Sequence, residues 1–138
     1  MIIDDLLMFT NDAGQKVSGT AAVSEYRLDF GQIAPTTGHS HGELVAVFSC
    51  KTDVTGNLTI SLQHSDEETS GYTDVATAVT LSAPKAGTQV VIPMPYHHKR
   101  YVQANFGGTP SGTVHGFITS GFQDNNGFAQ APSLNTVY

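Results

Sequence analysis

Two histidines and a glutamate follow one another closely in the stretch 39–43, which reads His-Ser-His-Gly-Glu. In an extended strand, alternate residues share a face at a spacing of about 7 Å, so His39, His41 and Glu43 would lie together. Imidazole and carboxylate groups are suitable ligands for zinc or iron. His115 could supply a further ligand, although nothing in the sequence requires it. A metal site is therefore one interpretation of this stretch.

The other interpretation, which we favour, is an exposed loop rich in glycine and histidine. The stretch resembles the first metal motif of cupins, which are also β-barrels, but Glu43 follows His41 by two positions rather than by several. No convincing second motif supplies another histidine. We therefore expect no cofactor, and we keep a cupin-like metal-binding protein as an alternative function.

Two further clusters carry charge. The run 97–100, His-His-Lys-Arg, is the only dense basic cluster, and it is either a solvated turn or an electrostatic contact for an acidic partner surface. The acidic run 66–68 lacks the alternating oxygen ligands of a calcium site, so a solvated loop is favoured. The candidates for partner contact are the four residues of the basic run and the tyrosine before it: Tyr96, His97, His98, Lys99 and Arg100.

No pattern for catalysis is present in the sequence. No Gly-x-Ser-x-Gly motif surrounds any serine, and no glycine-rich phosphate loop joins a strand to a helix. The carboxylates are too scattered for a general acid and base pair. The single cysteine, Cys50, ends an apolar run and is expected to be a small core residue rather than a nucleophile. We predict that the protein is not an enzyme.

Composition limits the classes of partner. The chain has 138 residues, which is typical of one domain, and its net charge of −6 argues against binding to nucleic acid or to anionic membranes. Only 13% of residues are charged, about half the usual fraction, and neutral polar residues take their place. Such residues suit a surface that a partner covers, because a hydroxyl or amide is less costly to bury than a charge. Without a signal peptide pattern, we expect synthesis in a reducing cytoplasm.

Alternating apolar and polar residues predict about eight antiparallel strands separated by polar turns. The cleanest alternation is at 22–30, where Tyr26 and Leu28 are expected to face inward with their even-numbered neighbours. Residues 43–50 are apolar on both faces, which predicts a central strand covered on both sides. Further strands are expected at 57–64, 74–81 and 88–94. This spacing favours a jelly-roll-like β-sandwich, an all-β fold, over a parallel sheet.

The stretch 100–122 predicts a β-hairpin, since two alternating runs flank the turn residues Gly-Gly-Thr-Pro-Ser-Gly. Val102, Ala104 and Phe106 share one face of the first run. We expect a single domain over 1–138, with an N-terminal segment at 1–20 and an extended C-terminal arm at 123–138. Phe128 and Tyr138 of that arm are further candidates for partner contact, because an arm without a strand period buries its aromatic residues only by docking.

Three stretches resemble, in order and spacing, the jelly-roll capsid cement (decoration) proteins of tailed phages. They are the opening Met-Ile-Ile-Asp-Asp-Leu-Leu-Met-Phe-Thr-Asn-Asp-Ala-Gly-Gln, the Leu-Gln-His-Ser-Asp-Glu at 62–67, and the Lys-Arg-Tyr-Val-Gln-Ala-Asn-Phe at 99–106 with its Gly/Thr turn and closing strand. The resemblance covers most of the chain. The histidines at 39, 41, 97 and 98 are not typical of the family and leave room for a bound ion or a pH-dependent contact.

The resemblance implies a structural virion protein without catalytic activity. Its expected partners are the major capsid protein and further copies of itself, as a homodimer or homotrimer on a symmetry axis, on the outer surface of the capsid. A carbohydrate- or receptor-binding β-sandwich of the particle is a third possibility, in which exposed aromatics such as Tyr72 or Tyr96 would contact a glycan.

Overall fold

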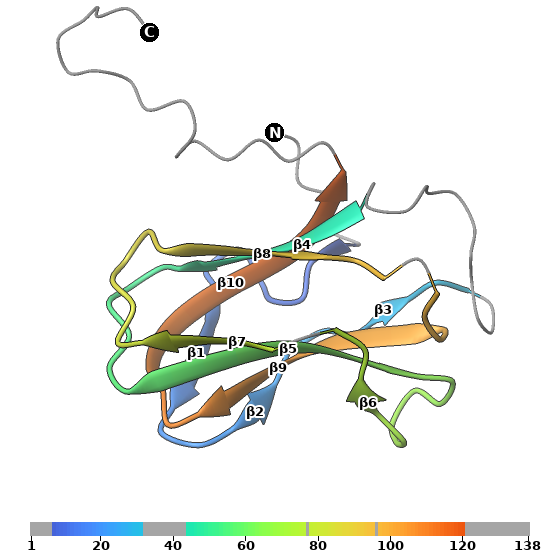
Figure 1. The fold of residues 1–138 in the computed structure, drawn as a ribbon, viewed down its shortest axis with the longest axis horizontal. Helices are drawn as coiled ribbons and strands as arrows, with labels where there is room; N and C mark the ends of the chain where they lie inside the picture. Colours follow the sequence, from blue (N-terminus) through green and yellow to red (C-terminus); the bar gives the residue numbers. More distant parts are fainter. Residues whose placement is uncertain (1–6, 32–43, 77, 96, 121–138) are drawn as a thin grey trace, which may run out of the picture.

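The computed structural model describes residues 7–31, 44–76, 78–95 and 97–120, which form two antiparallel sheets packed face to face (Figure 1). The predicted all-β sandwich is confirmed. The strands are β1 (Gln15–Ser18), β2 (Ala22–Val23), β3 (Leu28–Asp29), β4 (Leu44–Cys50), β5 (Asn57–Ser65), β6 (Thr73–Asp74), β7 (Val79–Ser82), β8 (Gln89–Pro93), β9 (Tyr101–Gly108) and β10 (Ser111–Ser120).

The order of the strands is that of a jelly roll. Sheet A has the order β1-β10-β4-β8, and sheet B has the order β2-β9-β5-β6, with β3 also paired to β9 and β7 to β5. If β2 with β3 and β6 with β7 each count as one interrupted strand, ten strands occupy eight positions. The first position then pairs with the eighth, the second with the seventh, the third with the sixth and the fourth with the fifth, as in a jelly roll.

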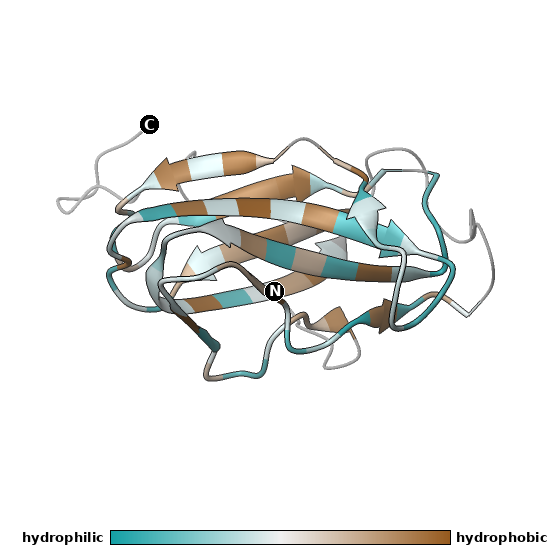
Figure 2. Ribbon diagram, turned by 90° about the horizontal axis from the view of Figure 1, so that it is seen from below, coloured by the Kyte–Doolittle hydropathy of each residue, from teal (hydrophilic) through white to brown (hydrophobic). Residues whose placement is uncertain are grey.

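The core lies between the sheets and follows the predicted alternation, which Figure 2 shows as alternating hydrophobic and hydrophilic residues along the long strands. Val102, Ala104 and Phe106 of β9 are fully buried, as are the inward residues of β5. β4 lies between β10 and β8 and buries residues on both of its faces, which confirms the predicted central strand. Cys50 is buried in this core, as predicted, and burial raises the pKa of its thiol.

The predicted hairpin at 100–122 is wrong, although its two strands and their faces are correct. β9 pairs with β2, β3 and β5 in sheet B, whereas β10 pairs with β1 and β4 in sheet A. Thr109 and Pro110 therefore carry the chain from one sheet to the other. Backbone bonds to the start of β5 and to the residues before it fix this corner: Thr109 N donates to Asn57 O (3.0 Å) and Ser111 N donates to Thr55 O (2.9 Å). A sharp turn between two strands does not dictate that they share a sheet.

The predicted strand at 22–30 is interrupted between β2 and β3. Ser24 N still donates to Ala104 O of β9 (2.8 Å), but Tyr26 N donates to Phe9 O (2.9 Å), which lies beside β10 of sheet A. The chain thus leaves sheet B between Ser24 and Leu28, and Tyr26, expected to face inward, is 47% exposed. The single strand predicted at 74–81 is also wrong, because β6 and β7 pair with separate parts of β5.

The close packing at the corner between the sheets predicts that Gly108 cannot be replaced without a loss of stability. Gly108 has a φ of +85°, and a Cβ there would lie 2.4 Å from Asn57 O. We expect Gly108→Ala to lower the free energy of unfolding by about 2–4 kcal/mol, from the left-handed backbone and the displaced carbonyl together. Chemical denaturation measures this loss.

Gly87→Ala is the matched control, since Gly87 has a φ of +88° with no heavy atom within 4 Å of its added Cβ. It should lose only about 1–2 kcal/mol. Equal losses in the two variants would show that the close approach at Asn57 contributes nothing.

Candidate interaction surfaces

The basic run 97–100 leads into β9, and its members have different surroundings. His98 is only 4% exposed, and its ring meets that of Phe30 edge-on with centroids 4.4 Å apart. Its Nδ1 donates to Lys99 O (2.8 Å). His97 is exposed. His98 thus packs against the sandwich, and of the two histidines His97 is the one with an open surface.

Arg100 forms a two-point ion pair with Asp29 of β3. Its Nε lies 2.8 Å from Asp29 Oδ1 and its Nη2 lies 3.1 Å from Oδ2. The bond from Arg100 and one from the Gly31 backbone lower the pKa of the Asp29 carboxyl. Both side chains remain between about one third and one half exposed, so this pair is still accessible to a partner.

His64 of β5 connects this end of sheet B to the segment before β9. Its Nδ1 accepts the backbone N–H of Lys99 at 3.1 Å, which requires an unprotonated Nδ1. Burial, and then the charges of Lys99 and His98, lower the pKa of His64, while Asp66 opposes them. The neutral imidazole is therefore the form that the fold uses.

The candidate metal ligands His39, His41 and Glu43 lie outside the described residues. Within the described ranges, no group of three or more His, Cys, Asp or Glu side chains is arranged to hold a metal ion. His115 lies on the face of β10 away from the core, where its ring is buried 5.5 Å from that of Phe117. Burial lowers the pKa of His115.

The other aromatic candidates are only partly described. Tyr96, Phe128 and Tyr138 lie outside the described residues. Tyr72 is half-buried, and its hydroxyl donates to Glu68 O (2.8 Å). The Arg27 guanidinium lies 5.8 Å from the centre of its ring. The face of Tyr72 that a sugar would need therefore already has a cation close to it.

A row of apolar residues crosses the outer face of sheet A, and the sequence alone did not indicate it. Met8 lies opposite Phe117, which lies opposite Val47, which lies opposite Val91 of β8. The first three are buried and Val91 is 38% exposed. β8 is the last strand of its sheet and carries no charged residue, so this edge lacks the charges that usually protect edge strands.

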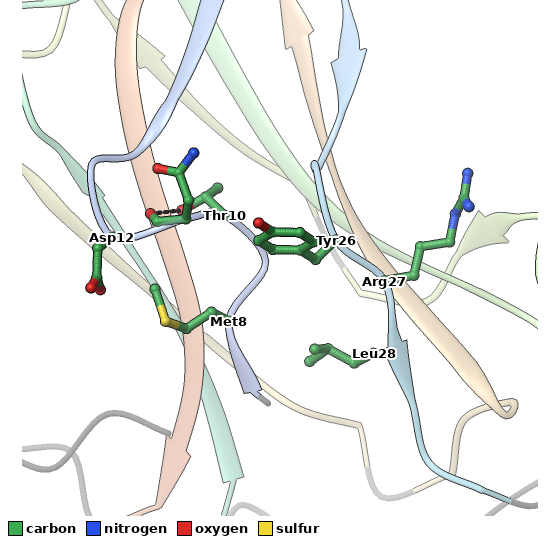
Figure 3. Close-up of a pocket in the computed structure, with 7 residues that line it drawn as sticks. Met8, Thr10, Asp12, Tyr26, Arg27 and Leu28 are labelled. Atoms are coloured by element: carbon green, nitrogen blue, oxygen red, sulfur yellow. Dashed lines mark hydrogen bonds between the residues drawn. The ribbon is translucent and has the colours of Figure 1, made fainter. Parts of the chain in front are cut away.

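A pocket of about 520 Å³ opens at the Met8 end of this row, away from β8. It lies between residues 8–12 and residues 26–28. Figure 3 shows Met8 and Asp12 on one side of it and Tyr26 and Leu28 on the facing side, with Arg27 extending away. Arg27 Nε donates to Gln103 Oε1 (3.1 Å), which holds it on sheet B. Met8, Leu28 and the Tyr26 ring therefore give the pocket apolar and aromatic surface, while Thr10, Asn11 and Asp12 give it polar surface on one side.

Side chains bridge the two sheets beside this pocket. Gln15 Nε2 donates to Val23 O (2.8 Å), and Gln15 Oε1 accepts the Glu25 N–H (2.7 Å). Asn11 Nδ2 donates to Glu25 Oε2 (3.1 Å). These bonds hold the two sheet edges at a fixed separation, so the fold itself determines the width of the pocket. No local sequence pattern indicates the pocket, because its two walls come from separate segments.

The comparison with protein families places the chain. The sequence model of the Bbp16 family matches residues 11–122, from the turn before β1 to just past β10. The chain belongs to the Bbp16 family. This is a phage-associated family, so the predicted association with a phage is confirmed. A comparison with curated proteins finds no match. No helix among the described residues is long and apolar enough to cross a membrane.

The His64 contact predicts a pH dependence. Because the folded pKa of His64 is lowered, the unfolded chain takes up a proton first as the pH falls below about 6.5. Stability should therefore decrease from that pH down to the folded pKa. In His64→Asn, the amide oxygen keeps an acceptor for Lys99 N without titrating, so we expect a shallower decrease. Thermal unfolding measured from pH 7.5 to 5 checks this.

His97→Asn is the control, since His97 is exposed and is not a member of the contact between His64 and Lys99. If His64→Asn follows the same pH curve as the wild type, the neutral His64 acceptor does not contribute to the acid sensitivity.

Proposed function

We propose that this member of the Bbp16 family is a capsid cement (decoration) protein. It would bind the outer surface of an icosahedral phage head and stabilise contacts between major capsid subunits. The observation that carries the proposal is that the phage-associated family match extends over the whole sandwich. The unit associated with the phage is thus the β-sandwich itself, and not an appended segment.

The physical character of the chain supports a clamping role. A protein that binds only the assembled shell stabilises that shell by mass action, without any catalytic group. Few charges and many neutral polar groups reduce the desolvation penalty of a covered surface. Further copies of the chain on a two-fold or three-fold axis would add avidity, because each bound copy tethers the next.

The proposal assigns contact roles to the two ends of the segment formed by β9 and β10. The run 97–100 would meet an acidic surface of the major capsid protein through His97, Lys99 and the accessible Arg100. The arm at 123–138 would bury Phe128 and Tyr138 against a neighbouring subunit. The uncharged edge of β8 is a further surface at which a second copy could lie.

A reconstitution experiment tests the proposal. Purified chain added to shells of the major capsid protein should bind at fixed stoichiometry and raise the temperature at which the shells dissociate, as light scattering would show. In a density map of the particle, we expect the chain on the outer surface of the capsid. Shells that neither bind the chain nor gain heat resistance would rule out a cement function.

Deletion of residues 123–138 separates the arm from the sandwich. We expect the shortened chain to keep the circular dichroism and cooperative unfolding of the full chain, because β1 to β10 end at Ser120. Its binding to shells should be much weaker. Undiminished binding by a folded, shortened chain would assign the contact to the sandwich alone.

A further inference from the structure

We propose that the pocket between residues 8–12 and 26–28 receives a lysine or arginine side chain of a neighbouring capsid subunit. This inference rests on the cement function proposed above and adds a defined contact to it. None of the residues that line the pocket was among the contact candidates predicted from the sequence.

The walls of the pocket suit an aliphatic stem. Met8 and Leu28 are each 4% exposed and supply apolar surface from the two sheets. The Tyr26 ring stands beside them, 47% exposed, on the side facing Met8 and Asp12 (Figure 3). Lysine and arginine bury a hydrocarbon stem along such surface while their charged head remains near water.

The charge of the pocket suits a cation at the end of that stem. Asp12 is exposed and forms no ion pair with the described residues. Arg27 lines the rim, but its guanidinium is held away by Gln103 and the Tyr72 ring. The pocket therefore offers a carboxylate and an aromatic face, which both attract an ammonium or guanidinium group.

A protein side chain is favoured over a free small amine by the position of the pocket. The pocket opens at the edge between the two sheets and is lined by Tyr26, which with Val23 of the same segment is among the exposed large hydrophobic residues of the described chain. A partner surface that covers these two residues would bring its own side chains to the opening. Because the chain carries a net charge of −6, a basic residue of the partner is the complementary one.

Binding to shells by full-length variants tests this contact. We expect Asp12→Asn and Tyr26→Ser each to weaken binding about three- to fivefold, the effect of one partly exposed charge or cation–π contact. The loss in Asp12→Asn should shrink as salt concentration rises. Both side chains are exposed, so thermal unfolding should be unchanged.

Asp74→Asn is the matched control. Asp74 lies on β6, at the edge of sheet B opposite β2, and asparagine keeps the oxygen that accepts Gln63 Nε2. It should bind as the wild type does. If the wild type binds shells and Asp12→Asn binds equally well, the pocket proposal is wrong while the cement function stands.

If the wild type binds no shells, the cement function fails, and a second measurement decides about the pocket. A chemical-shift titration compares Nα-acetyl-lysine methylamide with Nα-acetyl-norleucine methylamide, which has a similar stem without the charge. Shifts at residues 8–12 and 26–28 with the lysine compound alone support a cation site. No shifts, or equal shifts with both compounds, overturn it.

Discussion

The packing of the Phe48 ring is the contact on which the sandwich depends. This ring of sheet A stacks on Phe9 with centroids 5.6 Å apart, and it meets the edge of Phe106 of sheet B at 6.0 Å. Gly116 lies directly opposite Phe48 in the β4–β10 pair. A Cβ at Gly116 would lie 2.5 Å from the ring, so the absence of a side chain gives the ring its place. The ring that contacts sheet B is thus seated over a glycine of its own sheet, and close packing leaves no room for a side chain there.

Phe9, which stacks on Phe48, also positions the residues at the edge of the sandwich where the pocket opens. Phe9 N donates to Gly116 O (2.8 Å), and Phe9 O accepts the N–H of Tyr26 (2.9 Å). The residue that stacks on Phe48 thus also draws the chain between β2 and β3 toward sheet A. Its neighbour Met8, on one side of the pocket, and Tyr26, on the other, are placed by the same two backbone bonds. The pocket is a consequence of how the core is closed.

The alternation of the sequence predicted strands and faces because it reports which side chains are buried, and burial alternates along every strand. Val102, Ala104 and Phe106 face the core as predicted. Alternation does not report which strand lies beside which, and this is why the two runs of 100–122 were wrongly paired. In the structure the hydrogen-bonding edges of β9 and β10 are taken by strands that are distant in sequence.

The candidate surfaces were less predictable for a related reason. Charge runs are visible in a sequence, so the run 97–100 could be found, but its internal pairing of Arg100 with Asp29 joins residues 71 positions apart. The pocket joins two segments through Phe9 and Tyr26, and no local pattern links them. The one available signal was the break at Ser24, whose hydroxyl donates to Tyr26 O (2.8 Å) and accepts Ala104 N–H (3.0 Å). A serine in an alternating strand does not by itself predict such a turn.

The balance of charges favours a basic partner beyond the pocket itself. The ion pairs Lys85–Asp53 and Arg100–Asp29 each engage one cation and one carboxylate, so they leave the excess of acidic residues unchanged. Arg27 is held by Gln103 and Tyr72. Arg27, Lys85 and Arg100 are thus engaged within the described chain, whereas Asp12 forms no ion pair with the described residues. Exposed carboxylates of this kind are hydrogen-bond acceptors, and a partner surface with lysine or arginine side chains would supply the complementary donors.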